Sequence, residues 1–170
     1  MTTSNTRIFP DNAILDVEHC IICDSEQAPD DAVVFQDDLW ACAVTPGYEV
    51  PGWFFLRARR HALGWQELSD GELDTFAHRM KALVEAISEA TGAPTTYLMN
   101  FGESYGHFHC VVIARGTEIE PADRGGNILK LRADNLDRAA SLALVPAIRA
   151  TYCRIVGINF GVGGAPVPAA

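Results

Sequence analysis

Short runs of apolar residues, separated by turn residues, recur along this chain and predict β-strands. Aromatic and β-branched residues dominate these runs, and both classes are typical of strands. The predicted strands cover residues 33–38, 39–44, 53–57, 95–99 and 106–114. The first two runs lie close enough together to predict an antiparallel hairpin. The third run, which begins at Trp53, is so rich in aromatic and aliphatic side chains that we expect it to be buried on both faces.

A helical period replaces the strand pattern after residue 68. Ser69 and Glu72 have the spacing of a capping box, in which each side chain binds the main-chain N–H of the other residue. Apolar residues then recur at intervals of three and four and form one stripe. The stripe consists of Leu73, Phe76, Met80, Leu83, Val84 and Ile87. Gly92 and Pro94 predict the end of this helix.

A second helical pattern follows the last predicted strand and a polar loop at residues 116–126. Asp134 or Asn135 is the expected N-cap, and Pro146 predicts an interruption, because proline suits the first turn of a new helical piece. The predicted order is β-β-β-α-β-β-α. It indicates an α+β fold with a mostly antiparallel sheet, one long helix and a C-terminal helical segment. We expect an N-terminal arm at 1–18, one domain at 19–156 and a Gly/Pro/Ala-rich tail at 157–170.

Composition narrows the possible partners. The 170 residues carry a formal charge of −9, which argues against non-specific binding to nucleic acid or to anionic membranes. No apolar stretch approaches the ~20 residues of a membrane span, and the N-terminus lacks the apolar run of a signal peptide. Five cysteines, an odd number, suit a reducing compartment better than a disulfide framework. We therefore predict a cytoplasmic protein that binds neither nucleic acid nor membrane.

Two cysteines and two histidines form the first candidate site. Cys20 and Cys23 are separated by two residues, which lets both sulfurs reach one metal ion, and tetrahedral zinc readily takes two thiolates and two imidazoles. His61 and His107 lie at or near the ends of predicted strands. Alternatively, the cysteines form a redox pair, although no helix is expected to start at the motif, or they are simply two buried thiols. Taken alone, His61 can also be interpreted as an ordinary histidine at a strand end and not as a metal ligand.

His107 and His109 belong to the same predicted strand. Alternate residues of a strand share a face, so the two imidazoles are expected to point the same way, ~6–7 Å apart. His109 can attack phosphorus if a backbone carbonyl holds its near nitrogen and its far nitrogen stays free. In the preceding loop, Asn100, Gly102 and Ser104 offer groups that can bind phosphate oxygens. The alternative is a half-buried strand histidine with one satisfied hydrogen bond.

The stretch from Asn100 to Ile113 is similar to the signature of the histidine triad (HIT) family of nucleotidyl hydrolases and transferases. That signature is Asn-x-Gly, then Gly-Gln-Ser, then His-φ-His-φ-His-φ-φ, where φ is apolar. Cys20-Ile-Ile-Cys23 resembles the Cys-Ile-Phe-Cys of bacterial members. Pro51-Gly52 followed by His61 resembles their Pro-Gly-His…Pro-Lys-x-His strand. The likeness covers about residues 18–115.

The resemblance implies roles for individual residues. The ligands of a structural zinc fall on Cys20, Cys23, His61 and His107. The nucleophile, which forms a covalent nucleotidyl-histidine, falls on His109. The implied activity is that of a nucleotide phosphoramidate or phosphoanhydride hydrolase, or of a nucleotidyl transferase, and the implied assembly is a homodimer. A small nucleotide or nucleotide-like phosphate is the expected substrate.

The chain departs from the family pattern at several positions. Val111 stands where the third triad histidine is usual, so one contact to phosphate or leaving group is missing. Glu103 replaces the glutamine before Ser104, where it is a further candidate for binding the substrate and for acting as an acid, although it brings a negative charge near an anionic substrate. Trp53 replaces a common histidine. The aspartate that holds the ribose in many members has no clear counterpart in residues 41–46. These departures keep two other functions open: a non-catalytic, zinc-stabilised nucleotide-binding or scaffold protein, and a redox or metal-sensing module built on Cys20 and Cys23.

Overall fold

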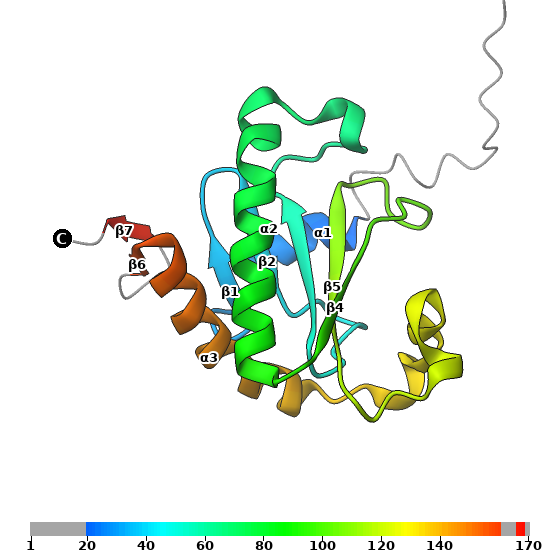
Figure 1. Cartoon of the computed structure of the whole chain (residues 1–170). Helices are drawn as coiled ribbons and strands as arrows, with labels where there is room; N and C mark the ends of the chain where they lie inside the picture. Colours follow the sequence, from blue (N-terminus) through cyan, green and yellow to red (C-terminus); the bar gives the residue numbers. More distant parts are fainter. Residues whose placement is uncertain (1–19, 161–165, 169–170) are drawn as a thin grey trace, which may run out of the picture.

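The computed structural model describes residues 20–160 and 166–168 and has an antiparallel sheet of five strands at its centre (Figure 1). The strands are β1 (Val33–Gln36), β2 (Trp40–Ala43), β3 (Trp53–Ala58), β4 (Thr95–Met99) and β5 (His109–Arg115). Their order in the sheet is β1-β2-β3-β5-β4, and every neighbouring pair is antiparallel. The predicted α+β fold and the predicted β1–β2 hairpin are confirmed.

Helices cover both faces of the sheet unequally. The two long helices, α2 (Asp70–Thr91) and α3 (Arg138–Val156), pack on one face and enclose the larger core. The short helix α1 (Ile21–Asp24) and the 3₁₀ segment Gly125–Leu131 contribute to a smaller core on the opposite face. We call this opposite face the site face, because both candidate histidines lie on it.

Strand β3 lies in the middle of the sheet and is buried on both faces, as its apolar sequence predicts. Phe54 and Leu56 face the core under the long helices, whereas Trp53 and Phe55 belong to the core of the site face. Arg57 continues the second set and is also buried. A charged residue in this position is not expected from the strand pattern.

The predicted capping box of α2 is present. The Ser69 side chain accepts a hydrogen bond from the main chain of Glu72, and the Glu72 side chain accepts one from the main chain of Ser69. The helix ends at Gly92, whose φ of 66° is left-handed and suits glycine. Both ends of this helix therefore follow from local sequence.

Glu72 also binds Arg60, with a distance of 2.7 Å between its carboxylate and the guanidinium. Burial raises the pKa of Glu72, but hydrogen bonds from Arg60 and Ser69 outweigh it, so the pKa lies below its ordinary value. A lowered folded-state pKa means that the stabilisation is complete above the unfolded-state pKa and is lost as pH falls through the folded-state pKa. We expect Glu72→Gln to cost about 1 kcal/mol at pH 7 and less below about pH 4.

Thermal unfolding of the wild type and the Gln variant between pH 7 and pH 3 measures this difference. Glu85→Gln, at an exposed position on the same helix, is the matched control and should show no comparable pH dependence. A Glu72→Gln deficit that stays constant down to pH 3 would contradict the assignment.

Helix α3 corrects two predictions. Its N-cap is Asp137, whose side chain accepts a hydrogen bond from the N–H of Ala140, rather than Asp134 or Asn135. The helix also runs without interruption through Pro146. Proline in a helix interior removes one backbone hydrogen bond and costs ~3 kcal/mol. Tertiary packing offsets this cost, because Val145, Ile148 and Tyr152 are buried in the main core.

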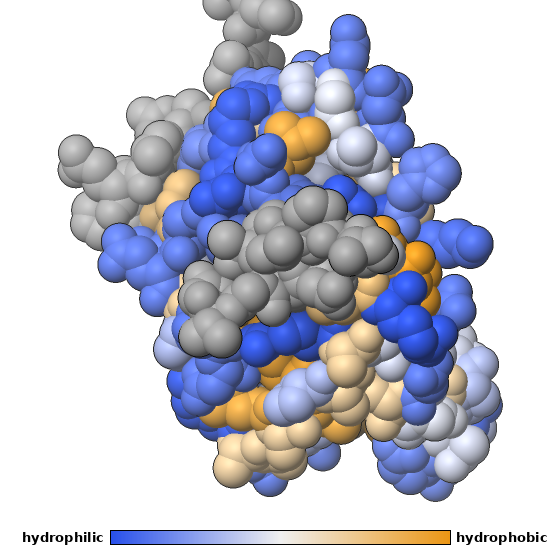
Figure 2. Space-filling view, turned by 90° about the vertical axis from the view of Figure 1, so that its left-hand side faces the viewer, coloured by the Kyte–Doolittle hydropathy of each residue, from blue (hydrophilic) through white to orange (hydrophobic). Residues whose placement is uncertain are grey.

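Helix α3 is also, within the described part of the chain, long and apolar enough to cross a membrane by length and composition. It packs on α2 and β1, however, and Arg149 donates hydrogen bonds to the main-chain carbonyl of Val33. Figure 2 looks onto the side that carries α3 and shows apolar side chains between polar ones. Packing within the domain buries 22% of the apolar window of this helix, and the absence of a membrane partner stays a prediction.

The chain ends were predicted as an arm and a loose tail. Residues 1–18 lie outside the described residues. In the predicted tail, β6 (Ile158–Phe160) and β7 (Pro166–Pro168) form a small antiparallel pair, so this part is not simply loose. Residues 161–165 and 169–170 lie outside the described residues. The three domain boundaries therefore stay predictions.

Candidate metal centre and active site

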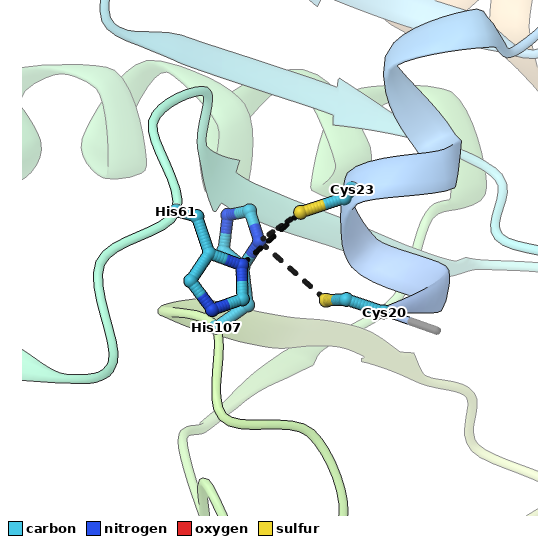
Figure 3. A group of neighbouring side chains, drawn as sticks. All are labelled: Cys20, Cys23, His61 and His107. Atoms are coloured by element: carbon cyan, nitrogen blue, oxygen red, sulfur yellow. Dashed lines mark hydrogen bonds between the residues drawn. The ribbon is translucent and has the colours of Figure 1, made fainter. Parts of the chain in front are cut away.

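The structure brings together the two cysteines and two histidines of the predicted metal site. One ligand atom from each of Cys20, Cys23, His61 and His107 lies within 4.8 Å of all the others. The Cys23 Sγ is 3.1 Å from Nδ1 of His61 and 3.3 Å from Nδ1 of His107. The Cys20 Sγ is 3.7 Å from the same His107 nitrogen. Figure 3 shows both imidazoles turned toward the two sulfur atoms.

Three separate segments supply these four side chains. Cys20 is the N-cap of α1, and Cys23 lies within this one-turn helix. A short helix therefore does begin at the motif, contrary to the prediction, because the N–H of Asp24 bonds to the carbonyl of Cys20 at 3.0 Å. A spacing of three residues places both sulfurs on one side of that turn. His61 follows β3 by three residues, and His107 precedes β5.

The hydrogen bond of His107 decides which of its nitrogens can bind a metal. Its Nε2 is 2.7 Å from the main-chain oxygen of Ala58. A carbonyl only accepts, so Nε2 carries the proton and Nδ1 presents its lone pair to the cysteines. A ligating histidine held by a backbone carbonyl in this way is usual in metal sites. The His61 Nε2 is buried without a partner among the described residues.

Burial shifts the pKa values of two of the four side chains, Cys23 and His107. Burial, and the neighbouring Cys20, raise the pKa of Cys23 to about 11, although Arg57 opposes the rise. Burial lowers the pKa of His107 to about 4, so its imidazole is neutral at pH 7, as a metal ligand must be. Two cysteine sulfurs and two imidazole nitrogens are a donor set that zinc takes, with the cysteines bound as thiolates. The arrangement is compatible with zinc.

His109 is the first residue of β5, and His107 lies before the strand rather than in it. The predicted strand therefore starts too early, because the ring of His107 is fixed by Ala58 and the ladder with β3 begins at His109 opposite Arg57. Both imidazoles nevertheless lie on the site face. His109 is only 7 % exposed and stacks on Phe55, with ring centroids 5.4 Å apart and an interplanar angle of 5°.

The near nitrogen of His109 is held as the nucleophile hypothesis requires. Nδ1 lies 2.7 Å from the main-chain oxygen of His107, so it carries the proton and Nε2 holds the lone pair. Burial lowers the pKa of His109, although the hydrogen bond to His107 opposes this, and the ring is neutral at pH 7. Sequence reasoning missed Phe55 and Tyr105, which pack beside this ring. The sequence offered one signal for them, since both are aromatic residues, Phe55 in a predicted strand and Tyr105 in the loop before His109.

Not all of the predicted phosphate-binding groups in the loop before β5 point toward the His109 ring. The side-chain nitrogen of Asn100 donates to the main-chain oxygen of His109 at 2.6 Å, so Asn100 positions the histidine backbone instead of presenting that donor to a phosphate. Gly102 has a φ of 67° and gives the loop a left-handed turn. Glu103 and Ser104 are exposed, and the hydrogen bond and ring pairs found for His109 in the described residues involve His107, Phe55 and Tyr105 instead.

Val111 occupies the third position of the triad pattern. It pairs with Phe55 and Met99 across the sheet and is buried in the core of the site face. Alternation along β5 places it on the same face as His109. The position that would carry a third imidazole is therefore filled by hydrocarbon packing.

No family model and no curated protein matches the chain. Solved structures do. A hypothetical histidine triad nucleotide-binding protein from Sulfolobus tokodaii superposes with a TM-score of 0.63 over 81% of this chain and 95% of that one, at 16% identity. The chain has the histidine triad fold. A zinc-bound histidine triad family protein from Mycobacterium smegmatis matches with a TM-score of 0.57 at 15% identity, over 81% of this chain and 96% of that one.

A uridylyltransferase also shares the histidine triad fold with this chain, with a TM-score of 0.56 and 19% identity. The match covers 79% of this chain and 45% of the uridylyltransferase. At these identities the likeness concerns the fold. The sequence motifs and the three-dimensional comparison therefore point to the same fold. Any chemical activity has to be argued from the residues of this chain.

Proposed function

We propose that this chain is a nucleotidyl hydrolase or transferase that acts on a nucleoside phosphoramidate or phosphoanhydride through a covalent intermediate on His109. The observation that carries the proposal is the 2.7 Å contact between Nδ1 of His109 and the main-chain oxygen of His107. It fixes the tautomer in which Nε2 is a neutral nucleophile. The sequence signature and the fold support the same chemistry.

The reaction has two displacements. In the first, Nε2 of His109 attacks the α-phosphorus, an N–P bond forms, and the bond from phosphorus to the leaving group breaks. The leaving group takes the bonding electron pair and a proton from solvent. In the second, water or another acceptor attacks the same phosphorus, the N–P bond breaks, and the electron pair returns to Nε2. The proton of the acceptor is released, and a nucleoside monophosphate or its ester leaves.

The surrounding residues prepare His109 for these steps. The stacked Phe55 ring holds the imidazole plane, and Asn100 holds the main-chain oxygen behind it. Loop amides from Asn100 to Gly106 and the exposed Ser104 are the groups we assign to the phosphate oxygens. Glu103, also exposed, lies in the same loop and is assigned to the leaving-group side of the substrate. Val111 supplies no donor, so the rate should fall below that of a site with a third histidine.

We also propose that Cys20, Cys23, His61 and His107 hold a structural zinc ion. Bound there, zinc would join α1, the segment after β3 and the segment before β5. The 4.8 Å grouping of the four ligand atoms supports this assignment. A redox pair at Cys20 and Cys23 would not need two imidazoles beside it. That reading predicts a reversible disulfide and no tightly held zinc.

The second candidate function is a non-catalytic, zinc-stabilised nucleotide-binding or scaffold protein. Val111 favours it, because the hydrocarbon at the third triad position removes a contact to the reacting phosphate. Release of AMP from adenosine 5′-phosphoramidate by the purified protein separates the two functions. Release supports the enzyme. No release from folded, zinc-loaded protein, together with saturable AMP binding, would favour the binding protein.

We propose a homodimer in the cytoplasm. Cys20, Cys23, Cys42 and Cys110 are free thiols in the described residues, which agrees with a reducing compartment. Strand β4 is an edge strand, and Leu98 on it is 52 % exposed. An exposed apolar edge strand is a template for pairing with another chain.

We expect the wild type to sediment as a dimer and Leu98→Lys to shift it toward monomer by at least tenfold in dissociation constant. Leu136→Lys is the control, since Leu136 is 49 % exposed but does not lie on the sheet edge. Analytical ultracentrifugation measures both variants. A monomeric wild type, or a Leu98→Lys variant that dimerises normally, would contradict the proposed interface.

A further inference from the structure

Arg57 is a buried charge in the middle of the sheet, next to the candidate metal centre. It lies on β3 between Ala41 of β2 and His109 of β5, and it is 2 % exposed. Its Nη2 donates to a carboxylate oxygen of Glu26 at 2.5 Å. Glu26 follows Cys23 by three residues, in the 3₁₀ turn Ser25–Gln27. The ion pair therefore joins the cysteine segment to the central strand.

Further donors converge on the same carboxylate. Arg59 binds Glu26 through Nε at 2.9 Å and through Nη2, and the side-chain nitrogen of Gln36 lies 3.2 Å from it. Two guanidinium groups outweigh the burial of Glu26 and hold its pKa below the ordinary value. The carboxylate is thus ionised at pH 7 and clamped to two strands, β1 and β3, and to the residue that follows β3.

The environment of Arg57 is not explained by stability of the sheet. A buried ion pair can often be replaced by apolar residues without loss of stability, so its presence is weak evidence for a stabilising role. In addition, Nη1 of Arg57 is buried without a partner among the described residues, and an unmet buried donor costs ~1–3 kcal/mol. The geometry places Arg57 beside the metal centre, because its partner Glu26 follows Cys23 by three residues and the neighbouring Ala58 accepts the hydrogen bond of His107.

We propose that Arg57, through Glu26, is a positioning residue for the metal centre. The pair holds the segment of Cys20 and Cys23 against the sheet before metal binds, so the thiols already face His61 and His107. Less ordering is then needed when the ion binds, and pre-organisation of this kind raises affinity. This inference rests on the proposed zinc site.

Zinc affinity of purified protein, measured by competition with a chromophoric chelator at pH 7, tests the proposal. We expect Arg57→Met and Glu26→Gln to weaken zinc binding by about 10–100-fold, the range found for residues that support metal ligands. The matched control is Arg79→Met. Arg79 lies on α2 and forms a partly buried pair with Asp37 at 2.7 Å, and its guanidinium does not bind Glu26. Its loss should leave the zinc dissociation constant within about threefold of the wild type.

The possible results separate the claims. A wild type that binds no zinc would overturn the zinc proposal and this inference together. A wild type that binds zinc, with folded Arg57→Met and Glu26→Gln variants of equal affinity, would overturn this inference alone. If Arg57→Met does not fold, Glu26→Gln decides, because it keeps every side chain at nearly its native volume. A similar loss of affinity in Arg79→Met would show a general effect of destabilisation and would also overturn the inference.

Discussion

Replacement of His109 by alanine is expected to abolish release of AMP from adenosine 5′-phosphoramidate. Without an imidazole no N–P bond can form, and removal of a catalytic nucleophile typically lowers turnover by 10⁴-fold or more. The variant should remain folded, because His109 lies at the start of β5 and truncation there costs about 1–2 kcal/mol. Turnover is measured by product formation, and folding by circular dichroism and zinc content.

His78→Ala is the matched control for this variant. His78 is an exposed histidine on α2, on the opposite side of the sheet, and its loss should leave turnover unchanged. His109→Gln adds a second test, since it retains most of the side-chain volume but no nucleophilic nitrogen. Retention of turnover in either His109 variant would contradict the covalent mechanism and favour another nucleophile or simple binding.

Replacement of Cys20 by serine is expected to lower zinc content and stability together. Serine is a poor zinc ligand, and the binding energy of a structural metal contributes directly to folding. Since zinc would link three segments of this domain, we expect a loss of several kcal/mol and a fall of the midpoint of thermal unfolding by ~10 °C or more. Elemental analysis of the purified variant gives the zinc content, and calorimetry gives the stability.

Cys42→Ala is the control for this change. Cys42 is fully buried in the core under the long helices and lies in a different cluster from the metal-site residues. Its replacement should cost stability through lost packing but leave zinc content at the wild-type value. Chelation of zinc from the wild type should reproduce the Cys20→Ser effect. A stable, zinc-free Cys20→Ser protein would exclude a structural role for the metal.

The His109 and Cys20 variants together test whether catalysis and metal-dependent stability depend on different residues of the site face. Loss of His109 should remove chemistry with little effect on the fold, and loss of Cys20 should remove stability and metal. The two residues lie in the same part of the molecule, since His107 contributes its ring to the metal group and its main-chain oxygen to His109. An equal loss of stability in both variants would contradict this separation of catalytic and structural roles.

Local sequence determined much of this fold. The capping box of Ser69 and Glu72 and the left-handed Gly92 set both ends of α2, because each depends only on near neighbours. The apolar run of β3 predicted a strand buried on both faces, since only a strand covered by packing layers above and below has that environment. The ligand types and spacings of Cys20, Cys23, His61 and His107 likewise predicted one cluster.

Tertiary structure decided the remaining features. The continuity of α3 through Pro146 depends on a buried stripe against the core, and the start of β5 depends on the bond between His107 and Ala58. The donor of Asn100 turns to the backbone of His109 because the loop folds back on the strand. These outcomes are set by contacts between residues far apart in the sequence, which no local pattern records. The sequence by itself therefore determined which groups are available for metal binding and catalysis, and only the packed structure decided which nitrogen of each histidine carries its proton.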